Sequence, residues 1–572
     1  MHDLIIRNAR IVDGLGNPEF MGDVAVDGDT IVGVGKLADD QARQTLDAGG
    51  LVLSPGFVDP HTHYDAQVAW DKLMTCSPEH GVTTVVIGNC GVGVAPVRDD
   101  MREFLMGDLV NVEGIPLDDM QQGIDWTWES FGEYLNELDK GGLGANIAAL
   151  VAMTPLRHYV MGSDSLYRAG NVSEIAQMGE LFSDAMEQGA FGFSTTIIGV
   201  HVGYGGKPVA CRNATLDEYR VLCQALKKLG RGSIELALKL TGDVGEQERE
   251  LLTLLVNESD RPVTWLAVVN QAERPDSYLE RLDALEDLLG WDKAVPQTTC
   301  RPLRFQLDLA NPYILGVFPT WQPIMQMSRE EKIRCYRDPE FRQSFRDDLV
   351  NIPAFGSNVW KRFYVLDGVS DQARGFAEKK LTIAEIARDW DMDPMDCFCE
   401  LALEDELRTT FDLIALNYDE NDTIPLVQDK RLMIGLSDGG AHLNMLCDAG
   451  YSTHMLERWV RDTGALSLEE GVRKLTSEPA DFFGISNRGR IAAGCKADLV
   501  LFNPDTIACG DKQVVNDLPS GGKRFVTPAM GIHATFVNGE MLYKNGEHVG
   551  GLPGKVLRSY DCHPVIATDA AA

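Results

Sequence analysis

Short apolar runs alternate with helix-like stretches through the middle of the chain. Eight runs have the length of buried strands, and they lie at residues 55–61, 82–88, 146–153, 190–196, 233–240, 262–269, 294–300 and 432–437. Most are followed by a stretch with helical periodicity, such as residues 172–188 and 216–229. Parallel strands buried on both faces have continuous apolar sequences, and eight of them match the count of a (β/α)8 barrel. We therefore expect an α/β chain built on a TIM-type barrel rather than two unrelated α/β domains.

The two ends of the chain show a different pattern, in which short apolar segments alternate with Asp-Gly turns. This pattern covers residues 3–35 and returns at residues 497–502 and 534–540. Asp-Gly pairs between apolar segments are typical of β-hairpins. Because neither end has enough strands to bury a face alone, we expect both to pair into one small β sandwich.

The long connection between the seventh and eighth runs is rich in aromatic residues and arginine. We interpret it as an insertion over the barrel mouth, followed by the seventh barrel helix around residues 393–405, since so long a connection is rarely unstructured. The predicted segments are the N-terminal part of the sandwich (1–54), barrel strands one to seven (55–300), the insertion (301–390), the end of the barrel with strand eight (391–486), the C-terminal part of the sandwich (487–558) and a tail (559–572).

Composition narrows the possible functions. The chain has 52 Lys and Arg against 86 Asp and Glu, a net charge of −34, which disfavours nucleic acid and anionic membrane surfaces as partners. No apolar run approaches the ~20 residues of a membrane helix, and the N-terminus has no secretory signal pattern. We expect a cytoplasmic globular protein with mostly reduced cysteines and a small-molecule substrate. The sequence leaves open whether it forms a homo-oligomer.

Candidate metal ligands follow three of the predicted strands. His61 and His63, two residues apart, project to the same side at the carboxyl end of the first strand, where barrel active sites form. Two imidazoles there suit zinc or a similar divalent ion, although turn histidines can instead bond to carbonyl groups. Cys90 ends the second strand and is either a thiolate ligand or a buried, inert thiol. Asp438 follows the eighth strand, where it could ligate a metal and act as a base, or only cap a turn.

Taken together, these segments resemble the amidohydrolase superfamily, and within it the N-acyl-D-amino-acid deacylase (D-aminoacylase) family, over essentially the whole chain. The matching segments are the N-terminal strand pair at residues 4–14, the metal-binding signature PGFVDPHTH at 55–63, the cysteine motif GNCG at 88–91 followed by Ala95-Pro96, the catalytic aspartate in SDG at 437–439, and the return into the β sandwich at 489–500.

The resemblance implies hydrolysis of a C–N amide bond, with an N-acyl-D-amino acid or a related amide as substrate. It implies attack by a metal-bound water on the amide carbonyl. By position, His61, His63 and Cys90 are then metal ligands, and Asp438 is both ligand and proton shuttle. This agrees with the chemistry of the residues, because a bound cation acidifies water and the aspartate can pass a proton to the leaving amine.

The chain departs from the family where further histidines are expected. The family places one at the end of the fifth strand and one at the end of the sixth, but residues 202–441 contain no histidine, and the Gly-His after the third strand is absent. We therefore expect one ion rather than two, held by His61, His63, Cys90 and Asp438. Zinc is the first choice, with iron or manganese also possible. Lys239 could replace a missing ligand or base, although a lysine there is more often a solvated charge.

Substrate contacts are predicted from loops after the strands. Arg212 is the first choice for a bidentate clamp on a substrate carboxylate, and Arg157 is the second. His201, Tyr204 and His442 are candidates to line the pocket, although each could be a loop residue without a chemical role.

Two other functions remain open. The reduced ligand set is compatible with a metal-dependent barrel enzyme that does not hydrolyse its substrate, such as a decarboxylase or isomerase. The same scaffold could also persist as a catalytically silent binding protein.

Overall fold

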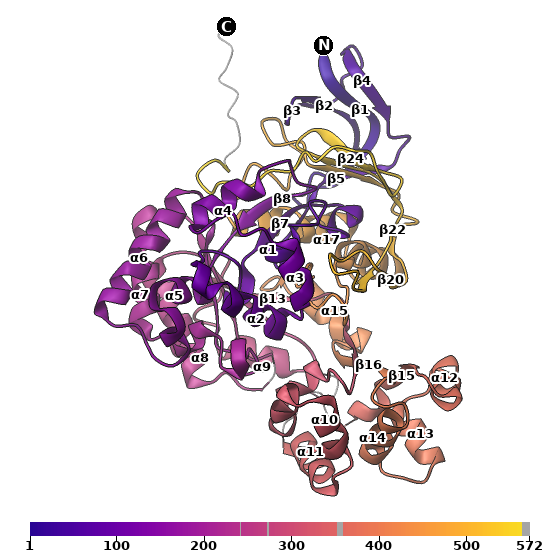
Figure 1. Cartoon of the computed structure of the whole chain (residues 1–572). Coiled ribbons are helices and arrows are strands. Elements are labelled where there is room, and N and C mark those ends of the chain that lie inside the picture. The colour runs from indigo at the N-terminus through magenta and orange to yellow at the C-terminus, as the bar shows by residue number, and fades with distance from the viewer. Residues whose placement is uncertain (241, 272–273, 352–357, 563–572) are drawn as a thin grey trace.

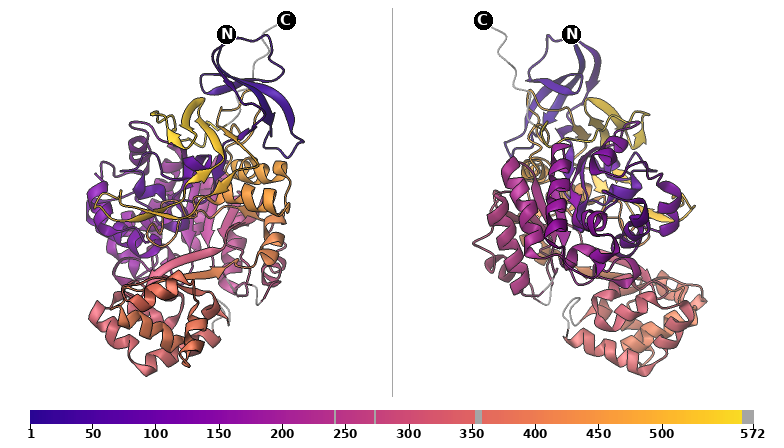
Figure 2. Two further views of the ribbon diagram at one scale, coloured as in Figure 1. Left: turned by 90° about the vertical axis from the view of Figure 1, so that its right-hand side faces the viewer. Right: turned by 60° about the vertical axis from the view of Figure 1, so that its left-hand side comes forward.

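A computed structural model of the chain describes residues 1–240, 242–271, 274–351 and 358–562. Figure 1 shows a central α/β region, a β domain built from segments near both ends of the chain, and a third unit on the side away from the β domain. The two further views in Figure 2 show the same order of the three parts.

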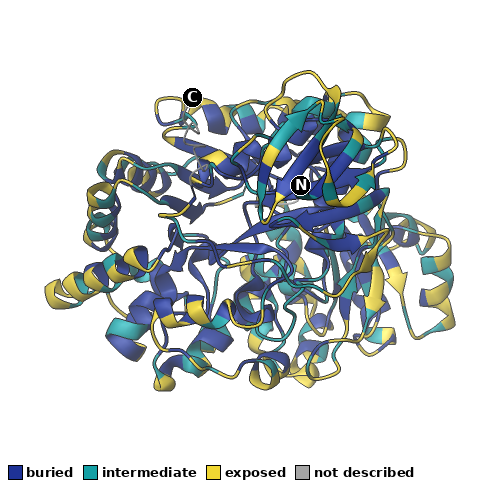
Figure 3. Ribbon diagram, turned by 90° about the horizontal axis from the view of Figure 1, so that it is seen from above, coloured by how far each residue is buried: buried dark blue, intermediate teal, exposed yellow. Residues whose placement is uncertain are grey.

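Parallel strands form the centre of the α/β region. They are β6 (Phe57–Asp59), β7 (Val82–Ile87), β8 (Asn146–Ala149), β9 (Val151–Ala152), β10 (Gly192–Thr196), β11 (Ser233–Ala237), β12 (Val263–Leu266), β13 (Ala294–Thr298) and β17 (Met433–Ile434). Each of the eight predicted apolar runs contains one strand, except that the third is split into β8 and β9. Every residue of these strands is buried, which explains their continuous apolar sequences. Figure 3 shows these buried strands and the exposed outer faces of the surrounding helices. The predicted α/β class is confirmed.

The strands pair into two parallel sheets, and local contacts bring the sheets together. One sheet has the order β6-β7-β8 and the other the order β9-β10-β11-β12-β13-β17. The amide of Phe191, just before β10, donates to the carbonyl of Ala149 in β8 over 2.9 Å. After the last strand, Gly439 forms a parallel bridge with Thr62, and its carbonyl accepts the amide of His63 over 2.7 Å. The carboxyl ends of the first and eighth strands are therefore adjacent.

Helices cover the outer side of the strands and begin at strong capping signals. Helices α6 (Val172–Glu187) and α7 (Leu216–Leu229) agree closely with the predicted stretches. The side chain of Asn171 accepts the first free amides of α6, and α7 ends at Gly230, which has the left-handed φ of +67°. One face of α7 is buried at helical spacing, by Tyr219, Leu222, Cys223 and Leu226.

The two ends of the chain form one β domain, as predicted. Its sheet contains β1 (His2–Ile11), β2 (Phe20–Asp27), β3 (Thr30–Gly35), β4 (Ala42–Asp47), β5 (Val52–Pro55), β18 (Leu499–Phe502), β23 (Ile532–Val537), β24 (Glu540–Lys544) and β25 (Glu547–His548). Strand β18 pairs with β5 on one side and with β23 on the other. Strand β1 pairs with β4 over its first part and with β5 at its end, so the nine strands form one branched sheet. The layering of this sheet as a sandwich stays a prediction.

The insertion is a compact unit that extends further along the chain than predicted. Its antiparallel sheet has the order β14 (Leu303–Asp308), β16 (Thr410–Leu416), β15 (Phe363–Asp367). Its helices are α10 (Arg329–Tyr336), α11 (Pro339–Asn351), α12 (Asp371–Glu378), α13 (Ile383–Asp389) and α14 (Pro394–Glu404). Since β16 is its central strand, the expected boundary at residue 390 falls inside the unit.

The helix predicted around residues 393–405 is present as α14, but it belongs to the insertion rather than to the barrel. Its Phe398 packs on Phe363 and Phe411 of the antiparallel sheet, with ring centroids 5.0 and 4.6 Å away. The helix that leads into β17 is instead α15 (Glu420–Gln428), whose Leu426 packs in a cluster with Val268.

Two further expectations concern the membrane and the tail. Among the described residues, no helix has both the length and the apolar character needed to cross a membrane. The predicted tail at 559–572 lies largely outside the described residues. Its described beginning is packed, because Cys562 is buried and its carbonyl accepts the amide of Asn487 over 3.2 Å.

Candidate metal centre

Three of the predicted ligands converge at the carboxyl ends of the first two strands. His61, His63 and Cys90 are buried and each offers one ligand atom, all within 4.8 Å of one another. Nε2 of His61 lies 3.5 Å from Sγ of Cys90. Thr62, between the histidines, donates its hydroxyl to the carbonyl of Val86 over 2.7 Å and so faces the neighbouring strand. Because side chains alternate along an extended segment, both histidines project to the opposite side.

Glycines allow the turn that presents Cys90. Gly88 has a φ of +80°, and a Cβ there would lie 2.2 Å from the carbonyl oxygen of Leu150. Gly91 has a φ of +70°, and a Cβ there would lie 2.8 Å from Cα of Thr195. Cys90 itself has a left-handed φ of +56°. The turn is therefore strained for side chains at both glycine positions, and it directs the thiol toward His61.

Asp438 follows β17, the last parallel strand, and lies beside the same cluster. Its Oδ1 lies 3.6 Å from Nε2 of His61 and 3.8 Å from Nε2 of His63. Its side chain is 23% exposed, whereas those of the two histidines are at most 2% exposed. Removal from bulk water raises the pKa of the Asp438 carboxyl to about 7. Asp438 is thus the donor most open to a substrate.

Two buried glutamates that the sequence did not single out complete the surroundings. Glu235 lies in β11, and its Oε2 accepts the backbone amide of Cys90 over 2.7 Å. Glu113 is the last residue of α2 (Arg102–Glu113), and its Oε1 lies 3.4 Å from Nδ1 of His63. Burial raises the pKa of Glu235 to about 8 and that of Glu113 well above its usual value.

The electrostatics of the cluster suit a cation. Burial lowers the pKa of His61 to about 3, so its imidazole is neutral and can ligate. Burial, followed by the nearby carboxylates Glu235 and Glu113, raises the pKa of Cys90 well above its usual value. An ionised thiol and carboxylates packed this closely repel one another unless a positive charge lies between them, and a divalent metal supplies that charge.

The spacing of the donor atoms also fits a metal. Nε2 of His61 lies 3.5 Å from Sγ of Cys90, and Oδ1 of Asp438 lies 3.6 and 3.8 Å from Nε2 of His61 and of His63. These three distances are close to, or slightly longer than, the roughly 3.3–3.7 Å between ligands of a tetrahedral zinc with bonds of about 2.0–2.3 Å. The residues present are therefore compatible with one such ion.

Of the predicted pocket residues, His442 and His201 lie near the cluster. Nε2 of His442 is 3.9 Å from Oε2 of Glu113, and its ring is 5.4 Å from that of Tyr313 in the insertion. The Tyr313 hydroxyl donates to the carbonyl of Val112, so the insertion contacts the site. His201 bonds through Nδ1 to the Thr196 hydroxyl over 2.8 Å, and burial lowers its pKa to about 3.

The two predicted arginine clamps have structural partners. Arg212 donates from Nη1 to the carbonyls of Gly199 and His201, over 2.9 and 3.2 Å, and thereby braces the loop after β10. The expectation for Arg157 is corrected by the structure. Its side chain is fully buried in an ion pair with Glu218 and also donates to the carbonyl of Arg168 over 2.8 Å, so it cannot clamp a substrate carboxylate.

Tyr204 has other contacts than the predicted pocket role, whereas Lys239 agrees with the favoured interpretation as a solvated charge. The Tyr204 hydroxyl donates to Glu103 over 3.0 Å and its ring lies 4.4 Å from that of Phe104, which places it against the outer part of α2. The side chain of Lys239 is 53% exposed and pairs with Glu248 over 3.5 Å. Lys239 is therefore a solvated charge and does not replace a missing ligand or base.

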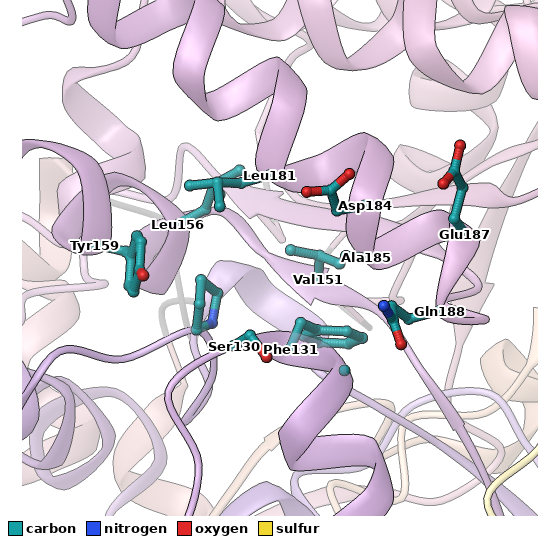
Figure 4. A pocket seen from close by; sticks show the side chains of 12 residues that line it. Ser130, Phe131, Val151, Leu156, Tyr159, Leu181, Asp184, Ala185, Glu187 and Gln188 are labelled. Carbon is teal, nitrogen blue, oxygen red and sulfur yellow. The ribbon is translucent and has the colours of Figure 1, made fainter.

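A separate cavity of about 180 Å³ lies away from the cluster. Figure 4 shows that Leu156, Leu181 and Phe131 form its apolar lining, with Tyr159 and Asp184 at its edge. None of the candidate metal ligands lines it.

The fold and the donor cluster define a class, the α/β proteins with a candidate metal centre at the carboxyl ends of parallel strands. The chain belongs to the amidohydrolase family, whose model matches residues 44–340 and 415–543. The unmatched stretch between these segments lies within the insertion.

Individual relatives agree over nearly the whole chain. A D-aminoacylase from Alcaligenes xylosoxydans xylosoxydans is 28% identical over 559 residues, covering 97% of each chain. An N-acyl-D-aspartate deacylase from the same organism is 28% identical over 569 residues, covering 98% of this chain and 96% of the relative. A solved D-aminoacylase structure, described as having a binuclear metal centre with one-metal activation, superposes with a TM-score of 0.65 at 25% identity and covers 98% of this chain and all of its own. The resemblance to the D-aminoacylase family is confirmed.

Proposed function

We propose that this protein is a metal-dependent hydrolase that cleaves the amide C–N bond of an N-acyl-D-amino acid or a related small amide. The observation that carries the proposal is the convergence of His61, His63, Cys90 and Asp438 at one edge of the parallel strands. The named activities of the full-length relatives support the reaction class. We further propose that the two parallel sheets close into one eight-stranded barrel, since the segments that follow β6 and β17 are bridged at Thr62 and Gly439.

His61, His63, Cys90 and Asp438 would hold one divalent ion, with zinc as the first choice. When bound, the ion polarises the amide carbonyl and acidifies water. A single ion is supported by the residues that follow β11 and β12. They include the buried, apolar Leu238 and Ala267, and Lys239 points to solvent, so this side of the cluster lacks the imidazoles of a second site.

Asp438 would move the proton during the reaction. Its Oδ1 faces both histidines, and its partial exposure places it between the buried donors and the solvent side from which a substrate enters. From there the carboxylate can accept a proton from the attacking water and return it to the leaving amine. The buried His61, His63 and Cys90 hold their positions and exclude water from the inner side of the centre.

The choice of an N-acyl-D-amino acid rests on the relatives, because neither predicted arginine presents an unengaged clamp. Arg157 is buried with Glu218, and Arg212 braces its own loop. A panel of N-acyl-D-amino acids, their L-enantiomers and simple amides would test the substrate class.

The deciding experiment combines metal analysis with product analysis in ¹⁸O-labelled water. We expect about one divalent ion per chain and label in the carboxylate product. Turnover without label would favour the non-hydrolytic alternative, which the reduced ligand set suggests. A metal-free protein that is fully active would overturn the proposal.

A further inference from the structure

Each histidine of the candidate metal centre turns its second ring nitrogen toward a buried glutamate. Nδ1 of His61 lies 4.0 Å from Oε1 of Glu235, and Nδ1 of His63 lies 3.4 Å from Oε1 of Glu113. All four atoms are buried and lack a well-formed hydrogen bond among the described residues, and the side chain of Gln297 also faces the His61 ring. The opposite nitrogen of each ring, Nε2, faces Asp438. The two rings are thus placed alike, each between the cluster and its own carboxylate.

The second oxygen of each glutamate lies near another part of the site. Oε2 of Glu235 accepts the backbone amide of Cys90 over 2.7 Å and so supports the left-handed turn that carries the thiol. Oε2 of Glu113 lies 3.9 Å from Nε2 of His442, and the Glu113 carbonyl accepts the amide of that residue over 2.5 Å. Each glutamate therefore connects a histidine with a loop of the site.

Such carboxylates need a reason to be buried. A buried carboxylate oxygen without a hydrogen-bond partner is unfavourable inside a protein, and so is an imidazole nitrogen left without one. If Nε2 of each histidine binds a metal, its Nδ1 carries the proton and can donate to the facing carboxylate. One bound ion would thereby give a hydrogen-bond partner both to the Nδ1 atoms of the two histidines and to the Oε1 atoms of the two glutamates.

We propose that Glu235 and Glu113 are positioning residues that fix the tautomer and ring orientation of His61 and His63 toward the metal. Glu235 also holds the turn that presents Cys90. The inference rests on the proposed metal centre, but it assigns roles to two residues outside the ligand set. Both glutamates act through the ligands, since their Oε1 atoms face Nδ1 rather than the Nε2 side where Asp438 lies.

The test uses the full-length chain with E235Q and E113Q, which keep size and remove charge. The control is E248Q, because Glu248 is a buried glutamate of α8 (Glu246–Ser259) that pairs with Lys239 and Arg281 rather than with any candidate metal ligand. Zinc affinity is measured by competition with a chelator. The Co²⁺ form is followed through its thiolate charge-transfer absorption, which reports Cys90 directly.

We expect E235Q and E113Q to bind zinc about 10–100-fold more weakly than the unaltered protein, still with one ion at saturation, and E248Q to bind normally. E235Q should also change the cobalt–thiolate absorption, because Glu235 holds the Cys90 turn. For a substrate that is hydrolysed, excess zinc should restore much of kcat while KM stays near its normal value. If a glutamine variant fails to fold, E235D or E113D provides the comparison. It keeps the charge but withdraws the carboxylate, and should also weaken zinc binding.

Several outcomes would overturn the inference. Affinities equal to that of E248Q would show that the glutamates are only structural, and loss of the ion at saturating zinc would make them direct ligands. An unaltered protein that binds no divalent metal would overturn both this inference and the proposed function. An unaltered protein that binds zinc but hydrolyses no amide would overturn the proposed function alone, because the affinity comparison does not depend on turnover.

Discussion

Oδ1 of Asp438 lies 3.6 Å from Nε2 of His61, although the two residues follow the last and the first strand of the central parallel array. The link is made by the backbone, where Gly439 pairs with Thr62 and accepts the amide of His63. The geometry of the centre is thus coupled to the contact between the first and last strands.

Replacing Asp438 tests the proposed proton transfer. We expect D438N to lower kcat by about 10²–10⁴-fold, because an amide cannot accept a proton from water. The measurement is kcat at saturating zinc, with zinc content determined on the same sample. Retention of full activity with normal metal content would contradict the role of Asp438.

Replacing Cys90 tests the thiol as a ligand. We expect C90S to bind zinc more weakly, because a serine hydroxyl does not ionise near neutral pH. The Co²⁺ form of C90S should also lack the thiolate charge-transfer absorption. C223S is a matched control, since Cys223 is buried on α7 and away from the cluster. A cobalt spectrum of C90S identical to that of C223S would show that the thiol does not bind the metal.

A pair of glycine variants separates crowding from backbone strain. G91A should lower the free energy of unfolding by about 2–4 kcal/mol and weaken metal binding, because the new Cβ would lie 2.8 Å from Cα of Thr195 in a left-handed backbone. Gly230 has a similar φ, but no atom lies within 4 Å of a Cβ placed there. We therefore expect G230A to lower the free energy of unfolding by only about 1–2 kcal/mol. Chemical denaturation measures both values, and equal losses would contradict the proposed crowding at Gly91.

His80 gives a prediction for pH dependence. It is fully buried, with its ring nitrogens 2.7 Å from the Thr453 hydroxyl and 2.8 Å from the Thr527 carbonyl, and burial lowers its pKa to about 4 from 6.5. The unfolded state therefore binds the proton more tightly, and the contribution of His80 to stability is present above pH 6.5 and is lost as the pH falls toward 4.

The H80Q variant isolates this contribution. Compared with H80Q, the unaltered protein should lose up to roughly 3 kcal/mol more unfolding free energy between pH 6.5 and pH 4. Denaturation curves at several pH values measure the difference. Parallel pH profiles for the two proteins would show that His80 does not titrate in this range.

Metal addition should stabilise the fold. Because the site brings Glu113, Glu235, Asp438 and Cys90 close together, a bound cation favours the folded state over the unfolded one. Free zinc at about 100 times Kd should stabilise the protein by about 2.7 kcal/mol and raise Tm. Calorimetry with zinc and with a chelator checks this, and identical transitions would argue against a metal centre.

The sequence was sufficient to predict those candidate site residues that directly follow apolar strands. His61, His63, Cys90 and Asp438 could be grouped because parallel strands place their carboxyl ends at one edge. Their roles as ligands stay predictions until metal is measured. Lys239 looked like a possible substitute because it ends an apolar run, but strand β11 stops at Ala237 and the lysine turns to solvent.

The features that the sequence did not predict depend on contacts between residues far apart in the chain. Glu235 had a detectable signal, since a glutamate between Ile234 and Leu236 interrupts a buried strand and requires an explanation. Glu113 ends an ordinary helix and reaches the site only through packing. The ion pair of Arg157 with Glu218 joins α5 (Met153–Met161) to α7, and no local pattern predicts it. The extent of the insertion was missed because β16 pairs with β14 across about a hundred intervening residues.

The pairing of β5 with β18 has a consequence for synthesis on the ribosome. The first five strands emerge early, but the edge of β5 is covered only when β18 leaves the ribosome, after almost the entire chain has been made. During that interval the nascent chain exposes a strand edge that can pair with a neighbouring copy. C-terminal truncations that remove β18 should therefore cause aggregation through the N-terminal strands, even though the candidate metal ligands are all retained.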